Sequence, residues 1–174
     1  MQISLTRLRT DNIIVSTALL LFSAVAFPLL VHLIPPYQGI PMGAYLLPMF
    51  YVPFIAIGLY RFKPAIFIAL MAPMISFLIS GNPQLGFMGI LTLEVLLFTC
   101  MAAALMASSV RWVAAPLAYV GAKIVSSSLL FVWPLIPATP WEFFSNSLMN
   151  GAPGIFILLL VNIAVLRFPI KKHG

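Results

Sequence analysis

The sequence predicts an all-α membrane protein, a bundle of six transmembrane helices with both termini in the cytoplasm. Of its 174 residues, 63% are hydrophobic and 7% are charged, whereas a soluble domain carries about 25% charged residues. Breaker residues divide the chain into six apolar segments, and the basic residues fall on alternate connections between them. Lipid is therefore the solvent for most of the chain, which we expect to form a single transmembrane domain.

Each segment has roughly the 20 residues that a helix needs to cross a hydrocarbon core of about 30 Å. The predicted helices cover residues 13–34, 43–60, 64–80, 85–107, 112–133 and 147–168. Pro35 and Pro36 end the first segment, and Pro64 suits the first turn of the third. The start of the sixth helix is left open, because Gly151, Pro153 and Gly154 interrupt its pattern.

The first segment has two interpretations. Arg7 and Arg9 precede it, and Ala24-Val25-Ala26 resembles a signal-peptidase site. The apolar run continues to Ile34, which is long for a signal peptide and suits a transmembrane helix. We predict a retained first helix, with a cleaved signal as the alternative.

The basic residues predict the orientation. Eight of the nine lie in segments that an inside N-terminus would make cytoplasmic: Arg7, Arg9, Arg61, Lys63, Arg111, Arg167, Lys171 and Lys172. The predicted outer loops, around residues 36–42, 81–84 and 135–146, contain none. The positive-inside rule therefore predicts six spans with both termini inside.

Two charged residues, Glu94 and Lys123, fall within the fourth and fifth predicted helices. Each lies roughly 14 Å from the outer side, at 1.5 Å per residue. An unpaired charge at such a depth costs at least about 2.5 to 3.5 kcal/mol. Because the two helices are consecutive and antiparallel, we expect the residues to pair. The pair either lines a polar pocket and helps to hold a ligand, or is a structural tie between helices.

Further polar residues gather on the predicted outer side. They are Gln38, Asn82, Gln84, Glu142, Asn146 and Asn150. Each taken alone suits a solvated loop, but together they predict a site that opens outward above Glu94 and Lys123. The interrupted start of the sixth helix supports this prediction, because broken helices line binding cavities in transporters. His32 suits the headgroup level rather than a ligand site, and we predict no bound metal or cofactor.

Small residues recur at helical spacing on the third predicted helix, at Ala65, Ala69, Ala72 and Ser76, and on the fourth, at Ala103 and Ala107. Such stripes let helices approach closely. The stripe on the third helix either packs within this chain or docks onto another membrane subunit.

The positions of proline and glycine along the chain resemble those in substrate-binding S components of energy-coupling factor (ECF) transporters. The residues that carry the resemblance are the stretch from Leu47-Pro48-Met49 through Pro53 to Gly58, Ala72-Pro73, Gly81-Asn82-Pro83, and Glu94 followed by Ala102 to Ala104. They cover about residues 40 to 105. The docking motif of two alanines four residues apart in helix one is missing, and Arg61-Phe62-Lys63-Pro64 replaces the usual glycine-rich turn.

The resemblance implies a high-affinity binder of a vitamin or cofactor precursor in a bacterial or archaeal cytoplasmic membrane. It also implies as partners a transmembrane coupling subunit and two ATPase subunits, which use the ATP. The sequence contains no nucleotide loop, nucleophile elbow or HExxH zinc motif. We therefore expect neither an enzyme nor a nucleic-acid binder. The alternative function is a six-span membrane scaffold without solute binding; a small intramembrane enzyme ranks third.

Overall fold

A computed structural model describes residues 13–60, 62–81 and 84–167, and within these ranges the protein is helical with no β-strand. Its elements are α1 (Ile13–His32), α2 (Met42–Leu46), α3 (Pro48–Tyr60), α4 (Phe62–Ser80), α5 (Leu85–Met106), the 3₁₀ helix η2 (Arg111–Val113), α6 (Ala114–Leu129) and α7 (Pro140–Arg167). The predicted all-α class is confirmed.

Five candidate membrane spans occur in the described part of the chain. They are Ile14–His32, Met42–Tyr60 (α2 with α3), Phe62–Ser80, Leu85–Met106 and Pro140–Arg167, each long and apolar enough to cross a bilayer. The sixth long element, α6, has 16 residues, fewer than the roughly 20 that a straight span needs. The composition and length of these helices are those of a multi-pass membrane protein.

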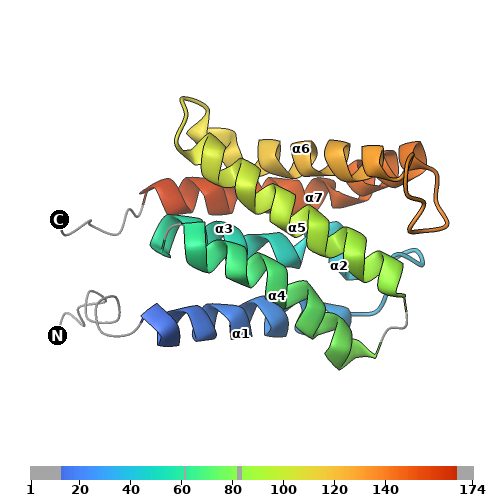
Figure 1. Cartoon of the computed structure of the whole chain (residues 1–174), viewed down its shortest axis with the longest axis horizontal. Coiled ribbons are helices and arrows are strands. Elements are labelled where there is room, and N and C mark those ends of the chain that lie inside the picture. Colours follow the sequence, from blue (N-terminus) through green and yellow to red (C-terminus); the bar gives the residue numbers. More distant parts are fainter. Residues whose placement is uncertain (1–12, 61, 82–83, 168–174) are drawn as a thin grey trace.

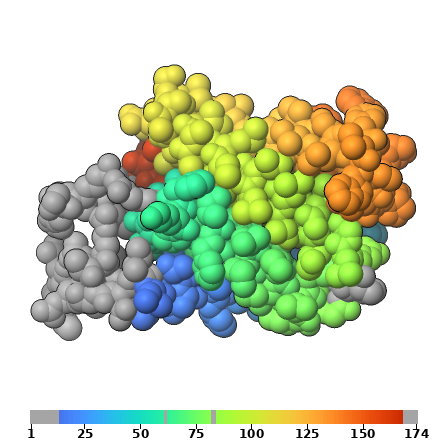
Figure 2. Space-filling model, in the orientation of Figure 1, coloured from blue at the N-terminus to red at the C-terminus, as the bar shows by residue number. Residues whose placement is uncertain are grey.

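The long helices lie side by side, and the chain reverses direction from one to the next (Figure 1). One end of the bundle, here called the basic end, holds the start of α1, the α3–α4 junction, η2 and the end of α7. Lys63, Arg111 and Arg167 belong to these segments. The other end, here called the α2 end, holds α2, the end of α1 and the starts of α5 and α7. Side chains of α4 and α5 occupy the middle of the face seen in Figure 2.

The predicted second helix is divided. Leu47 separates α2 from α3 and adopts a left-handed conformation, with φ 53° and ψ 43°. Pro48 permits the break, because a proline disfavours right-handed helical geometry in the residue before it and suits the first turn of a new helix. The predicted span over 43–60 matches the candidate span Met42–Tyr60, but two helices that meet at Leu47 form it.

The last helix is continuous from Pro140 to Arg167, so the prediction of an interruption at Gly151, Pro153 and Gly154 was wrong. Its start is fixed by a capping box. Thr139 Oγ1 accepts from the backbone N–H of Glu142 at 3.3 Å, and the Glu142 carboxylate accepts from the Thr139 backbone N–H at 3.1 Å. The sequence Thr139-Pro140-Trp141-Glu142 contained this signal.

The glycines of α7 serve close packing. A Cβ at Gly154 would lie 2.6 Å from Leu47 Cγ and 2.7 Å from Tyr45 O. The helix break at Leu47 is thus pressed against α7 where α7 has no side chain. Gly154, which the sequence suggested as a helix breaker, instead lies within a continuous helix and lets α7 contact Leu47 closely.

Asn162 of α7 is fully buried and holds the start of α6. Its Oδ1 accepts from Ala115 N–H at 2.9 Å, and its Nδ2 donates to Arg111 O and Trp112 O at 2.9 Å and 3.0 Å. The first N–H groups of a helix have no partner within the helix, so Asn162 supplies one from another element. In place of the predicted fifth helix, 112–133, the structure has η2 followed by α6, which ends at Leu129.

The alanine stripe of α4 faces the interior of the bundle. Ala65, Ala69 and Ala72 are 0%, 0% and 1% exposed. Ala65 and Ala72 pack in a cluster with residues of α1 and α3, whereas Ala69 joins the core formed with α3, α5 and α6. These alanines pack within this chain and do not form an exposed docking face.

Candidate functional site

Glu94 of α5 and Lys123 of α6 form a buried ion pair, as the depth argument predicted. Lys123 Nζ donates to Glu94 Oε1 at 2.7 Å and to Oε2 at 2.8 Å. Ser126, close to one helical turn beyond Lys123, donates its hydroxyl to Glu94 Oε1 at 2.8 Å. Glu94 is 2% and Lys123 7% exposed. Both charges are thus desolvated and compensated by each other.

Aromatic rings surround the ammonium group of Lys123. Nζ lies 4.4 Å from the ring centroid of Phe143 and 5.9 Å from that of Tyr119. The negative face of an aromatic ring attracts a cation. Lys123 therefore donates two hydrogen bonds to the Glu94 carboxylate. The faces of the two aromatic rings also stabilise the positive charge of its ammonium group.

A cavity of about 610 Å³ has the ion pair in its wall. Small-molecule sites are concave, of roughly 300 to 1,000 Å³, and combine apolar walls with a few polar groups. The cavity lies toward the α2 end, because its lining comes from the end of α1, from α2, the start of α3, the first half of α5, the middle of α6 and the start of α7. Its polar lining residues are His32, Gln84, Glu94, Tyr119, Lys123, Asn146, Ser147 and Asn150.

Five of the seven predicted substrate-binding residues line this cavity: Glu94, Lys123, Gln84, Asn146 and Asn150. Gln38 does not line it; it is exposed in the α1–α2 connection with φ 52°. Asn82 lies outside the described residues. Glu142, also expected near the site, is exposed and belongs to the capping box of α7.

Tyr119 and Ser126 were missed by sequence reasoning. Tyr119 precedes Lys123 by four residues and therefore shares its face of α6; its hydroxyl donates to Ser147 O at 3.3 Å. Ser126 follows Lys123 by three residues on the same face. Helical spacing from Lys123 could have identified both residues.

His32 also lines the cavity, although the sequence placed it at the headgroup level. Its Nδ1 donates to Pro28 O at 2.7 Å. Among the residues that the structure describes, no group of three His, Cys, Asp or Glu side chains could hold a metal ion.

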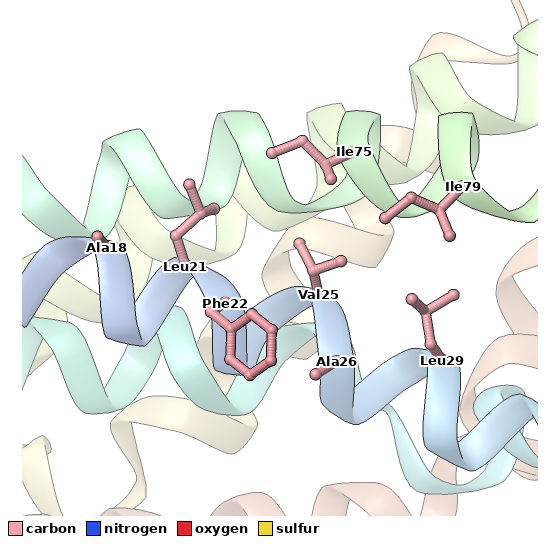
Figure 3. A pocket seen from close by; sticks show the side chains of 8 residues that line it. All are labelled: Ala18, Leu21, Phe22, Val25, Ala26, Leu29, Ile75 and Ile79. Carbon is pink, nitrogen blue, oxygen red and sulfur yellow. The ribbon is translucent and has the colours of Figure 1, made fainter.

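A second hollow, of about 380 Å³, lies between α1 and α4. Ile75 and Ile79 of α4 point toward Val25 and Leu29 of α1 (Figure 3). All eight described side chains that line it are apolar, so it offers no hydrogen bond to a polar solute. The cavity at the α2 end is therefore the candidate solute site.

Comparisons with protein-family models, with curated proteins and with solved structures found no match for this chain.

Proposed function

We propose that this chain is the substrate-binding S component of an ECF-type importer for a vitamin or cofactor precursor, in a bacterial or archaeal cytoplasmic membrane. The observation that carries the proposal is the cavity with a paired glutamate and lysine in its wall, at the end of the bundle opposite the basic residues. The positions of Pro and Gly in residues 40 to 105, which resemble those of S components, also support the proposal.

The proposal includes six spans with both termini in the cytoplasm. The 16 residues of α6 extend about 24 Å at 1.5 Å each. The three residues of η2 add about 6 Å at 2.0 Å each. Together they match a core of about 30 Å. Lys63, Arg111 and Arg167 at the basic end favour a cytoplasmic position for that end, so the cavity opens to the outside.

Substrate contact is assigned to lining residues Gln84, Glu94, Lys123, Asn146 and Asn150. They combine amide groups, which donate and accept hydrogen bonds, with an ion pair. Transport uses a transmembrane coupling subunit and ATPase subunits, because the sequence contains no phosphate-binding loop of its own. ATP is hydrolysed by those partners, and this chain is not an enzyme.

Native mass spectrometry of the detergent-purified chain tests solute binding. A small metabolite should stay bound to the unmodified protein and be lost from Asn146→Trp, whose indole would occupy part of the cavity and remove an amide from its wall. Met149→Trp is the matched control, because Met149 is 76% exposed on the same helix, and it should keep the metabolite. A chain that never retains a solute, whatever its host, would favour the scaffold function instead.

Cysteine labelling of intact cells tests the orientation, in a Cys100→Ser background. A membrane-impermeant reagent should reach thiols introduced at Gln38 and Thr139 but not at Lys63 or Arg111. Labelling of Lys63→Cys from outside would overturn the orientation without affecting the solute-binding result.

A further inference from the structure

The carboxylate and the ammonium group in the cavity wall neutralise each other. Among the described lining residues, Glu94 is the one acidic side chain and Lys123 the one Lys or Arg side chain, and the two form an ion pair. A bound carboxylate or phosphate would have to draw Lys123 away and leave Glu94 buried without a partner. A bound cation would meet a carboxylate already held by Lys123 and Ser126. Separating a buried pair is strongly unfavourable, so either charge on a solute is disfavoured.

Aromatic side chains reach the cavity from four helices. Phe50 comes from α3, Phe87 from α5, Tyr119 from α6 and Phe143 from α7. The Phe50 and Tyr119 rings are already perpendicular, with centroids 5.1 Å apart. Aromatic rings pack favourably in offset or edge-to-face arrangements. A flat ring system would therefore gain more contact here than a flexible chain.

Two amides provide the hydrogen bonds. Asn146 and Asn150 are four residues apart on α7, so they share a helix face and their Cβ atoms lie roughly 6 Å apart. Their side chains form no hydrogen bond with any described residue, and both line the cavity. Each amide offers one acceptor and two donors, which match the alternating N–H and C=O groups at the edge of a heterocycle. A polar group that is covered without a partner is costly, so a solute that covers these amides must satisfy them.

We infer that the cavity takes an uncharged, planar heterocyclic solute, with the aromatic residues contacting its faces and Asn146 and Asn150 its polar edge. This inference rests on the proposed function and narrows its substrate class. The Glu94–Lys123 pair acts as an internally neutralised wall that discriminates against ionised solutes.

Matched sets of probes that differ in charge test the inference on the purified full-length chain. Nicotinamide is uncharged, nicotinate is its anionic counterpart and 1-methylnicotinamide its cationic one; uracil and orotate form a second set, and lumichrome is a larger uncharged probe. Dissociation constants are measured by titration calorimetry. The tightest probe should be uncharged, and its ionised counterpart should bind roughly 100-fold more weakly, the effect of disturbing a buried pair.

Charge substitutions give a second, independent readout. Glu94→Gln leaves Lys123 unpaired and should move the preference toward nicotinate. Lys123→Met leaves Glu94 unpaired and should move it toward 1-methylnicotinamide. The double variant is neutral again and should return to the uncharged probe. If the single variants do not fold, the unmodified chain and the double variant still decide the question.

The two failures are distinguishable. Tightest binding of an anion, a cation or a free amino acid by the unmodified chain would overturn the inference and leave the solute-binding function standing. If none of the probes binds and no solute co-purifies, both the inference and the proposed function fail. A double variant that prefers an ionised probe would show that the neutrality of the cavity wall does not set the selectivity.

Discussion

Lys123 Nζ lies within 2.8 Å of both carboxylate oxygens of Glu94, so each residue compensates the buried charge of the other. Removing one partner with Glu94→Gln or Lys123→Met should lower the free energy of unfolding by about 3 to 5 kcal/mol, because the remaining charge is stranded. The double variant should recover most of this loss. Unfolding in detergent micelles measures all three, and additive losses would show that the pair is not coupled.

Asn162 should be as important to the start of α6 as an N-terminal cap. Asn162→Leu keeps the volume but removes the partners of Ala115 N–H, Arg111 O and Trp112 O. Each buried group left without a partner costs about 1 to 3 kcal/mol. We expect a loss in that range or above, together with faster amide exchange at the start of α6. Met149→Leu, at an exposed position of the same helix, should change neither measurement.

Thr139→Ala removes the side-chain oxygen that caps α7. The loss of unfolding free energy should be about 1 kcal/mol, the usual value for a cap, with faster amide exchange confined to the first turn of α7. Ser145→Ala is the control, because the Ser145 hydroxyl bonds to carbonyls of its own helix on an exposed face. Equal effects of the two substitutions would argue against the capping box.

Gly58 should tolerate no side chain while Val165 is present. A Cβ at Gly58 would lie 2.3 Å from Val165 Cγ1, across the contact of α3 with α7. Gly58→Ala should therefore lower stability by about 1 to 3 kcal/mol, as overpacking does. Adding Val165→Ala should relieve the clash. Gly89→Ala has nothing within 4 Å and should be neutral or slightly stabilising, because alanine favours helix over glycine.

Ala69→Trp separates the packing and docking interpretations of the alanine stripe. Because Ala69 is buried in the core, an indole there should reduce folding itself, seen as a lower thermal midpoint of the isolated chain. Phe67→Trp, at a half-exposed position on the same helix, should leave the midpoint unchanged. A folded Ala69→Trp chain with an unchanged midpoint would argue against internal packing.

Composition predicted the helical membrane class, because too few charges are present to cover a water-facing surface. The proximity of Glu94 and Lys123 followed from their depths on consecutive helices, a one-dimensional argument that needs no knowledge of packing. The helix boundaries were harder. Pro48 reads equally well inside a kinked helix or at the start of a new one, and only the contact of Leu47 with α7 decides between these.

Contacts distant in sequence could not be predicted in the same way. Asn162 is a lone polar residue in an apolar run, and nothing local indicates that it bonds to η2 and α6. Gly151 and Gly154 suggested a broken helix because glycine weakens helices, whereas the neighbouring elements use the missing side chains for close approach. Helical spacing from Lys123 predicts that Tyr119 and Ser126 share its face of the helix. Their contacts, however, depend on where α5 and α7 lie.

The contact of Leu47 with Gly154 also sets an order of events during synthesis. The two residues are separated by roughly 100 residues, which a ribosome adds in about 5 to 20 s. Until α7 is made, α2 and the helix break lack the α7 surface that they pack against, and Asn146 and Asn150 are absent. The nascent chain can insert its first helices early, but the cavity at the α2 end is completed only when the last helix arrives.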